Sequence, residues 1–302
     1  MTVEEQLAAA LAQVENLRMT IAEKDCIIQD LQNKLLYDIL RRQILSSEYI
    51  QIDESVIPVI DNEKHKARKG YEWCVRDAVT GDVMFYYDRG SRGHHVAREI
   101  LGGYRGNVQC DGYEAYVRRK FVDSLKENER LAMEGILFIR KLYKEESNAD
   151  DKGLSAEERM EQRRKISYPT ILMFEKWIEE TYAKVLPKSR LGEALAYAYS
   201  LLPRLSRYVN DGRINIDNNL IENAIRPLVL GRKNYLFCGN DASAYRAAIV
   251  YSLIGTCKAA GVDPRTWMEE VLSKLPYWQR DGKDLAGLLP RVWAKENQIT
   301  PK

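Results

Sequence analysis

The chain has 302 residues, of which 45% are hydrophobic and 30% are charged, with a formal net charge of +2. This composition can bury a sizeable core in one or two domains. No run of about 18 apolar residues is present, so the sequence predicts neither a membrane span nor a signal peptide and favours a cytoplasmic protein. The near-neutral charge does not exclude a nucleic-acid partner, because basic residues can still gather on one face.

The cysteines indicate a reduced protein. Five of them are scattered along the chain without a CxxC pair, and there are only three histidines. This distribution argues against a disulfide framework and against a structural zinc site. We expect mostly buried, free thiols.

Residues 1–40 carry a heptad repeat that predicts a coiled-coil helix. Apolar residues recur every seven positions on one seam, with a companion seam beside it: Leu7, Val14, Ile21, Ile28 and Leu35, then Val3, Leu17 and Leu31. A strict period of seven is typical of a coiled coil, whereas a helix packed on its own chain drifts toward 3.6. We therefore expect a homodimer through residues 3–38. The alternative is a helix folded back on its own domain.

The next segment reads as a strand and a hairpin. YIQIDESVIPVI alternates as a strand, Pro58 places the end of that strand near a sheet edge, and a basic loop follows from Lys64 to Lys69. Two aromatic and β-branched runs then bracket Thr80-Gly81-Asp82, which predicts a β-hairpin. Residues 93–103 predict a short helix stopped by glycines, and NVQCDGYEAY predicts a further strand that ends at Asp111-Gly112.

Helical patterns fill most of the remaining chain. Residues 117–208 lack strand signals and predict a helical insertion, interrupted by a charged loop at 148–158. A strand-like VLGRKNYLFCG follows Pro227, and a helix is expected over 241–260. Asp263-Pro264 opens a helix through Leu275, by the logic of a cap followed by proline. We expect residues 41–116 and 209–260 to form the core and residues 261–302 to form a helical tail.

Three acidic residues stand at strand ends or at the start of a helix: Asp53, Asp111 and Glu222. We interpret them as one metal-binding carboxylate cluster. Each also has an ordinary reading: Asn219 and Glu222 fit a capping box, Asp217 fits a helix cap, and Asp111-Gly112 is a common turn. Asp53 is harder to explain that way, because it lies among apolar residues.

Such a cluster suits metal-dependent phosphodiester chemistry. Two divalent ions about 3.5–4 Å apart can bind both the attacking and the leaving oxygen, so that no protein nucleophile is needed. Magnesium prefers oxygen ligands, which carboxylates from different elements supply. We expect two Mg²⁺ ions held by the three acids, with Mn²⁺ as an alternative.

The same residues resemble a known family. The motifs are IQIDESVIPVI, TGDVMFYYDRGSR, VQCDGYEAY, RRKF, DGRINIDNNLIENAIRPLVLGRKNYLFCGN and IVYSLIGTCKAAGVDP, between about Ile50 and Pro290. Together they resemble the catalytic region of insertion-sequence-66 transposases. This resemblance implies a DDE transposase, an α/β protein with an RNase H-like mixed sheet, a large helical insertion and an N-terminal coiled-coil helix.

The resemblance also assigns roles to residues. The catalytic triad falls on Asp53, Asp111 and Glu222, which would also be the metal ligands. The supporting residues are Asp217, Asn218 and Asn219, and the residues that would contact DNA are Arg213, Arg226, Arg232 and Lys233. Arg226 has an alternative role, which is to pair with Glu222 at i, i+4 on the helix.

The chain departs from the family pattern in two places. Tyr116 runs directly into Val117, where family members have a further strand, and Leu36 passes to Asp53 without the Cys and His cluster of a zinc-binding and helix-turn-helix region. Three readings follow. The preferred one is a transposase that cleaves transposon ends and transfers them to target DNA, together with accessory proteins of the same element, in the bacterial cytoplasm at the nucleoid. The others are a non-catalytic, DNA-binding regulatory dimer and a general RNase H-like nuclease.

Overall fold

The computed structural model describes residues 15, 18–19, 29–61, 63–110 and 113–299. It is an α/β structure with one four-stranded mixed sheet and many helices, in agreement with the predicted RNase H-like sheet and helical insertion. Most of the predicted coiled coil lies outside the described residues.

The described residues fall into two compact units. The sheet unit draws on residues 1–50, 54–106 and 224–302, and the helical unit on residues 51–53 and 107–223. The predicted domain boundaries remain predictions.

The sheet has the strand order β3-β2-β1-β4. Its strands are β1 (Tyr49–Asp61), β2 (Lys66–Asp77), β3 (Val83–Asp88) and β4 (Asn107–Cys110). β2 and β3 pair antiparallel, with Trp73 opposite Tyr86. The hairpin predicted around Thr80-Gly81-Asp82 is therefore confirmed. Gly81 has φ +82° in this turn, a conformation that glycine adopts without steric cost.

The strand predicted for YIQIDESVIPVI is confirmed as β1, with Pro58 inside it, whereas the loop predicted after it is wrong in part. Although proline has no N–H, its carbonyl still pairs, and it accepts a hydrogen bond of 2.8 Å from the Cys238 amide. Lys66 to Lys69, predicted as a loop, open β2. Both lysines are exposed there, so the pairing of this strand end needs no apolar side chains.

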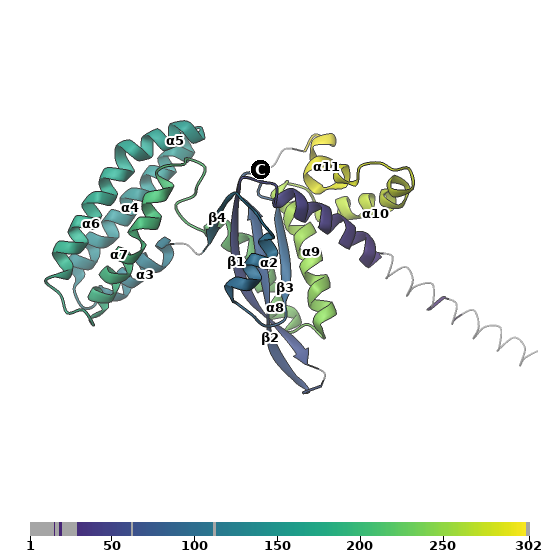
Figure 1. Cartoon of the computed structure of the whole chain (residues 1–302), viewed down its shortest axis with the longest axis horizontal. Helices are drawn as coiled ribbons and strands as arrows, with labels where there is room; N and C mark the ends of the chain where they lie inside the picture. The colour runs from purple at the N-terminus through teal and green to yellow at the C-terminus, as the bar shows by residue number, and fades with distance from the viewer. Residues whose placement is uncertain (1–14, 16–17, 20–28, 62, 111–112, 300–302) are drawn as a thin grey trace, which may run out of the picture. The chain divides into compact units, whose positions relative to one another are not determined.

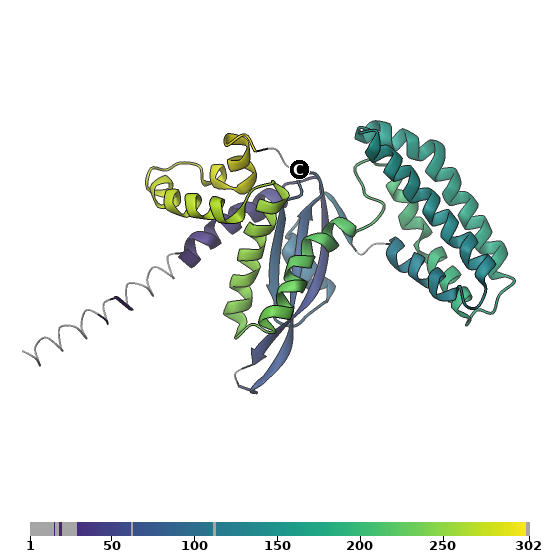
Figure 2. The same ribbon diagram turned by 180° about the vertical axis from the view of Figure 1, so that it is seen from behind.

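Strand β3 lies at one edge of the sheet, and hydroxyl groups cover its free backbone. The Ser252 hydroxyl accepts from the Phe85 amide at 2.7 Å, and the Thr256 hydroxyl both accepts from and donates to Val83. Both hydroxyls come from α9 (Asp241–Ala259), which runs alongside β3 in both views of the chain (Figures 1 and 2). The edge is thereby closed to pairing with another strand.

Residues 29–44 are helical and pack on the sheet unit. Leu36, Leu40 and Ile44 are fully buried at helical spacing, and the Tyr37 hydroxyl donates to the Phe85 carbonyl at 2.8 Å. Leu31, which belongs to the predicted heptad seam, is 62% exposed. The helix therefore buries a different face from the one that carries the seam.

The short helix predicted at 93–103 is α2 (His94–Leu101), which buries Val96 and Ile100. It ends at Gly102 in the left-handed conformation, with φ +49°. This is the glycine stop that the sequence predicts.

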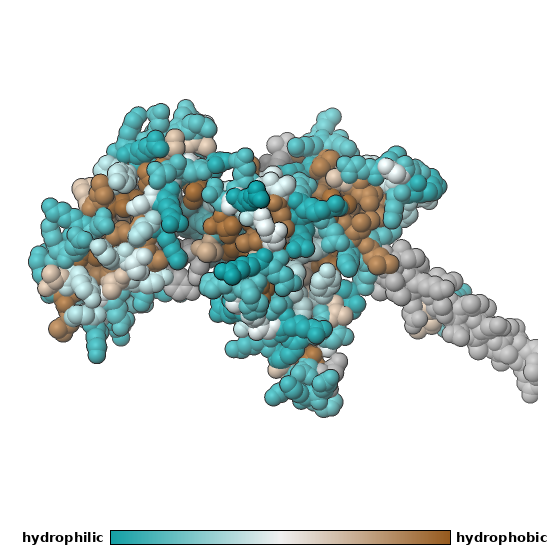
Figure 3. Space-filling model, viewed as in Figure 1, coloured by the Kyte–Doolittle hydropathy of each residue, from teal (hydrophilic) through white to brown (hydrophobic). Residues whose placement is uncertain are grey.

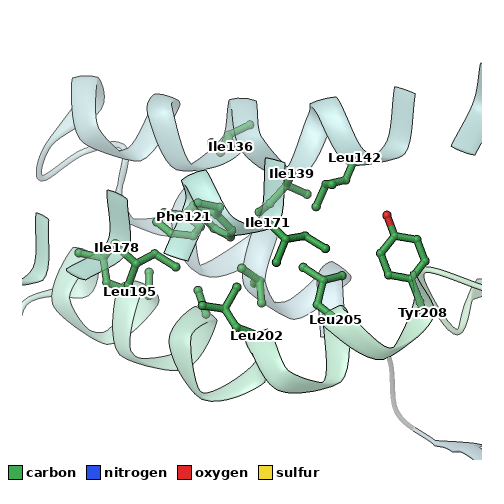
Figure 4. Packing of buried hydrophobic residues seen from close by; sticks show 14 of the residues in the cluster. Phe121, Ile136, Ile139, Leu142, Ile171, Ile178, Leu195, Leu202, Leu205 and Tyr208 are labelled. Carbon is green, nitrogen blue, oxygen red and sulfur yellow. The ribbon is translucent and has the colours of Figure 1, made fainter. Parts of the chain in front are cut away.

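The helical unit contains α3 (Tyr113–Ser124), α4 (Glu129–Asp151), α5 (Ala156–Gln162), η1 (Arg163–Ser167), α6 (Tyr168–Tyr182) and α7 (Arg190–Tyr208). Its core joins α3, α4, α6 and α7, with side chains such as Phe121, Ile139, Ile171 and Leu202 pointing toward one another (Figure 4). The charged loop predicted at 148–158 is shorter than expected. α4 continues to Asp151, because Ala149 still packs in its buried stripe, and α5 begins after the Ser155 capping box.

The surface of the helical unit mixes hydrophobic with hydrophilic residues (Figure 3). Leu137 and Met173 are among the large apolar side chains that are exposed there. Scattered apolar residues of this kind are ordinary on a protein surface.

The predicted strand after Pro227 is wrong. The segment continues α8 (Asn219–Tyr235), with Pro227 inside the helix. Ile221, Ile225 and Leu228 are buried at i, i+4 and i+7, a helical stripe whose packing outweighs the hydrogen bond that proline removes.

The last helices agree with the sequence in position but not in length. α10 (Pro264–Arg280) begins behind the predicted Asp263 cap and extends beyond Leu275, with Pro276 inside it. The tail holds η2 (Leu285–Leu288) and α11 (Pro290–Glu296). None of the helices within the described ranges has the length and apolar character needed to cross a membrane.

Candidate active site

Two glutamines connect the strands that precede the candidate acids. The Gln51 amide on β1 donates to the Gln109 side-chain oxygen on β4 at 3.3 Å. The Gln109 amide in turn donates to the carbonyls of Asn215 and Asp217, at 3.2 and 2.9 Å. This network ties β1 and β4 to the loop that leads into α8.

The Asp217 carboxylate fixes the start of α8. Its Oδ1 accepts from the Asn219 amide at 3.0 Å, and its Oδ2 accepts from the Tyr143 hydroxyl at 3.0 Å and from the Asn219 side chain. Asp217 is thus a helix cap, one of the two roles that the sequence leaves open. Tyr143 lies on α4, so this carboxylate also connects the start of α8 to that helix.

Glu222 lies in the first turn of α8, and its side chain is exposed. The Asn218 carbonyl accepts from the amides of Ile221 and Glu222, at 3.1 Å each. Asn218 itself is 2% exposed, and its side-chain Oδ1 has no hydrogen-bond partner in the part of the chain that the structure describes. Glu222 therefore lies in a first helical turn whose start is fixed by hydrogen bonds from Gln109 of β4 and Tyr143 of α4.

Asp53 lies inside β1 and not at a strand end as predicted, because the strand continues to Asp61, and its side chain is half-buried. It follows Gln51 by two positions, and residues two apart in a strand share a face, so Asp53 lies on the face that carries the Gln51–Gln109 contact. Asp111 lies outside the described residues. Among the residues that are described, no three His, Cys, Asp or Glu side chains gather as a metal site. The triad of Asp53, Asp111 and Glu222 therefore stays a prediction.

The predicted basic residues have different surroundings. Arg213 pairs with Asp211 at 2.8 Å, and this side-chain hydrogen bond lowers the pKa of the Asp211 carboxyl. Arg232 is half-buried and donates to the Val56 carbonyl of β1.

Arg226 and Lys233 are exposed. The ion pairs within the described residues do not include Arg226 with Glu222. The role of these four residues in DNA binding stays a prediction.

A buried arginine anchors the loop before the candidate site. Arg163 is 2% exposed, and its guanidinium makes two bonds to Glu146, at 2.9 and 2.6 Å. Its remaining nitrogen donates to the carbonyls of Tyr208 and Asp211, at 2.9 and 2.8 Å. The chain between α7 and α8 is therefore fixed just after α7.

Gln51, Gln109, Tyr143 and Arg163 are site-supporting residues that the sequence alone does not identify. Gln51 precedes Asp53 by two positions, and Gln109 precedes Asp111 by two positions. This shared spacing on two predicted strands is a signal that could have found the glutamine pair. Tyr143 and Arg163 lie in helices far away in sequence, and no local pattern identifies them.

Comparison with known proteins finds matches along most of the chain. The family model described as "Transposase IS66 family" matches residues 4–246, and that of the "IS66 C-terminal element" matches residues 252–290. No solved structure matches.

Two relatives come from Sinorhizobium fredii (strain NBRC 101917 / NGR234). The uncharacterized protein y4qI is 30% identical over 274 residues, which cover 80% of this chain and 50% of y4qI. The uncharacterized protein y4hP is 25% identical over 304 residues, which cover 88% of this chain and 54% of y4hP. The chain thus spans about half the length of these curated relatives.

Proposed function

Because the chain belongs to the IS66 transposase family, we propose that it cleaves DNA strands at transposon ends and transfers them to target DNA in a metal-dependent reaction. The proposed catalytic residues are Asp53, Asp111 and Glu222. The proposed place of action is the bacterial cytoplasm, at the nucleoid, where transposon and target DNA lie. Accessory proteins of the same element are proposed partners.

The observation that carries this proposal is the hydrogen-bonded network around Gln109. It joins β1 two residues before Asp53, β4 two residues before Asp111, and the Asp217 carbonyl five residues before Glu222. Three segments that are distant in sequence are thereby held together just ahead of the three acids. This supports a convergent carboxylate cluster.

The donor set suits magnesium. Asp53 and Glu222 offer carboxylate oxygens, one half-buried and one exposed, and hard divalent cations prefer oxygen ligands. When bound, two such ions would polarise the phosphate and lower the pKa of the attacking hydroxyl group or water. The chain's own contribution is to hold the carboxylates: β1 fixes Asp53, and the Asp217 cap fixes the turn that carries Glu222.

The test is nicking of a supercoiled plasmid that carries the DNA flanking the gene, with Mg²⁺, with Mn²⁺ and with EDTA. Asp53→Asn and Glu222→Gln should each lower the nicking rate to the level seen with EDTA, because each removes an anionic oxygen ligand. Glu193→Gln is the matched control, since Glu193 is an exposed acid in the first turn of α7. It should nick like the wild type.

The competing proposal is a transposase-derived, non-catalytic dimer that binds DNA and regulates. It is favoured by one observation: among the described residues the element that follows β4 is α3, where the family resemblance predicts a further strand. Wild-type protein that binds the plasmid DNA but does not nick it with either metal would support this alternative. Equal nicking by wild type and Glu222→Gln would contradict the proposed catalytic site.

A further inference from the structure

A groove of about 610 Å³ opens on the helical unit beside the start of α8. Three of its lining residues are arginines and none is a carboxylate: Arg118, Arg119, Val122, Ile139, Arg140, Tyr143 and Asn219 line it. They come from α3, α4 and the first residue of α8. The groove is therefore cationic, with apolar side chains between its charges.

Two of these arginines differ from other arginines of the helical unit. Arg159, Arg163 and Arg213 each pair with a carboxylate. Arg118 and Arg140 are exposed and form no ion pair with any residue that the structure describes. Their charges therefore remain available for an anion from outside the chain.

The groove adjoins the hydrogen bonds that hold α8. Tyr143 and Asn219 line the groove, and both donate to the carboxylate of Asp217. Asp217 caps the helix that carries Glu222 in its first turn. An anion in the groove would thus lie next to the residues that position the proposed catalytic glutamate.

We propose that this groove binds the phosphate backbone of the DNA strand that enters the candidate active site. Guanidinium groups donate in a planar fork that matches phosphate oxygens, and most protein–DNA hydrogen bonds go to the backbone. Val122, which is 42% exposed, offers apolar surface to the sugars between phosphates. The assignment rests on the proposed function for its ligand, and it gives α3 and α4 of the helical insertion a role in holding substrate.

The experiment measures binding of the full chain to a fluorescein-labelled DNA duplex by anisotropy, in EDTA, across a range of salt concentrations. Arg118→Gln and Arg140→Gln should each weaken binding roughly fivefold near 0.15 M salt, and each should reduce the slope of log affinity against log salt by about 1. The double variant should show roughly the sum of the two single effects on the slope and the product of the two single effects on the affinity. Arg164→Gln is the control, because Arg164 is an exposed arginine of the same unit that lies outside the groove.

Unchanged affinity and slope in the double variant, with circular dichroism like that of the wild type, would overturn the assignment. So would an equal loss in Arg164→Gln, because the effect would then be one of net charge. The result is independent of catalysis. If the wild type fails to nick DNA but the groove variants lose binding, the catalytic proposal is contradicted and the proposed DNA-binding role of the groove is supported. If the wild type nicks DNA and the groove variants bind normally, only the proposed role of the groove is contradicted.

Discussion

Glu72 is a buried acid of the sheet. It lies on β2 opposite Tyr87, and neither carboxylate oxygen has a hydrogen-bond partner within the described part of the chain. Burial raises the pKa of its carboxyl well above the ordinary value of 4.5. The folded protein therefore keeps Glu72 neutral under conditions in which the unfolded chain ionises it.

This difference predicts a loss of stability as the pH rises. Above about pH 4.5 the unfolded state releases the proton while the folded state holds it, so the free energy of unfolding falls from there toward the raised folded pKa. Glu72→Gln removes this pH-dependent contribution to the free energy of unfolding, because glutamine does not titrate. We expect its stability relative to the wild type to increase between pH 5 and pH 8 by about 1 kcal/mol or more, because one unit of pKa difference corresponds to about 1.4 kcal/mol.

Urea unfolding at the two pH values measures the effect. Glu63→Gln, at an exposed position between β1 and β2, serves as the control. Its free energy of unfolding should differ from that of the wild type by the same amount at pH 5 and at pH 8. A gain from Glu72→Gln that does not change with pH would show that Glu72 is not the titrating group.

Sequence patterns identify some acids of a sheet more readily than others. Asp53 stands out because it is polar among apolar residues in a single strand. Glu72 alternates with aromatic residues as any half-exposed strand residue would, and only the packing around the hairpin makes it fully buried. The glutamine bridge between Gln51 and Gln109 depends on strand order, which no local pattern contains.

At the scale of elements, the edge of the sheet depends on hydroxyls from α9. Ser252 and Thr256 are almost fully buried, and each bonds the backbone of β3. Burying two small polar side chains one helical turn apart costs free energy when their hydroxyls have no hydrogen-bond partners. Here they satisfy backbone groups that β2 cannot reach.

Removing one of these hydroxyls should leave a buried amide unpaired. Ser252→Ala deprives the Phe85 amide of its acceptor, which should lower the free energy of unfolding by about 1–3 kcal/mol. Ser273→Ala on α10 removes an exposed serine hydroxyl from a helix of the same unit and should have little effect. Chemical denaturation of both variants checks the difference. Equal stabilities would mean that the edge of β3 does not need this contact.

Elements defined by local chemistry were predicted well. The β2–β3 hairpin, the Gly102 stop of α2 and the Asp263 cap of α10 follow from turn and cap residues in the sequence. The sequence predicts a strand in the second half of α8 because Pro227 is an ordinary sign of a helix end. Its helical continuation depends on burial of Ile225 and Leu228, which is a tertiary effect.

At the scale of the whole molecule, the N-terminal segment has two faces with different uses. Leu36 and Leu40 are buried, whereas Leu31 on the predicted heptad seam is exposed. An apolar residue at a seam position that stays largely exposed on its own unit favours a partner chain over the folded-back alternative. We therefore keep the proposal that the protein forms a homodimer through residues 3–38.

The boundary between the two faces defines a clean deletion. Removing residues 1–38 would also remove Leu36 and Tyr37 from the core, whereas removing residues 1–28 spares them and still eliminates most of the seam. The shortened chain should have the mass of a monomer by light scattering, while its thermal unfolding temperature stays close to that of the full chain.

A charge on the seam tests the same interface without deletion. Ile21→Lys should dissociate the dimer, because a charge at a seam position is desolvated in the coiled coil, whereas Met19→Lys, at a position 63% exposed and outside both seams, should leave it intact. A dimeric mass for both the deletion and Ile21→Lys would place the association elsewhere in the chain.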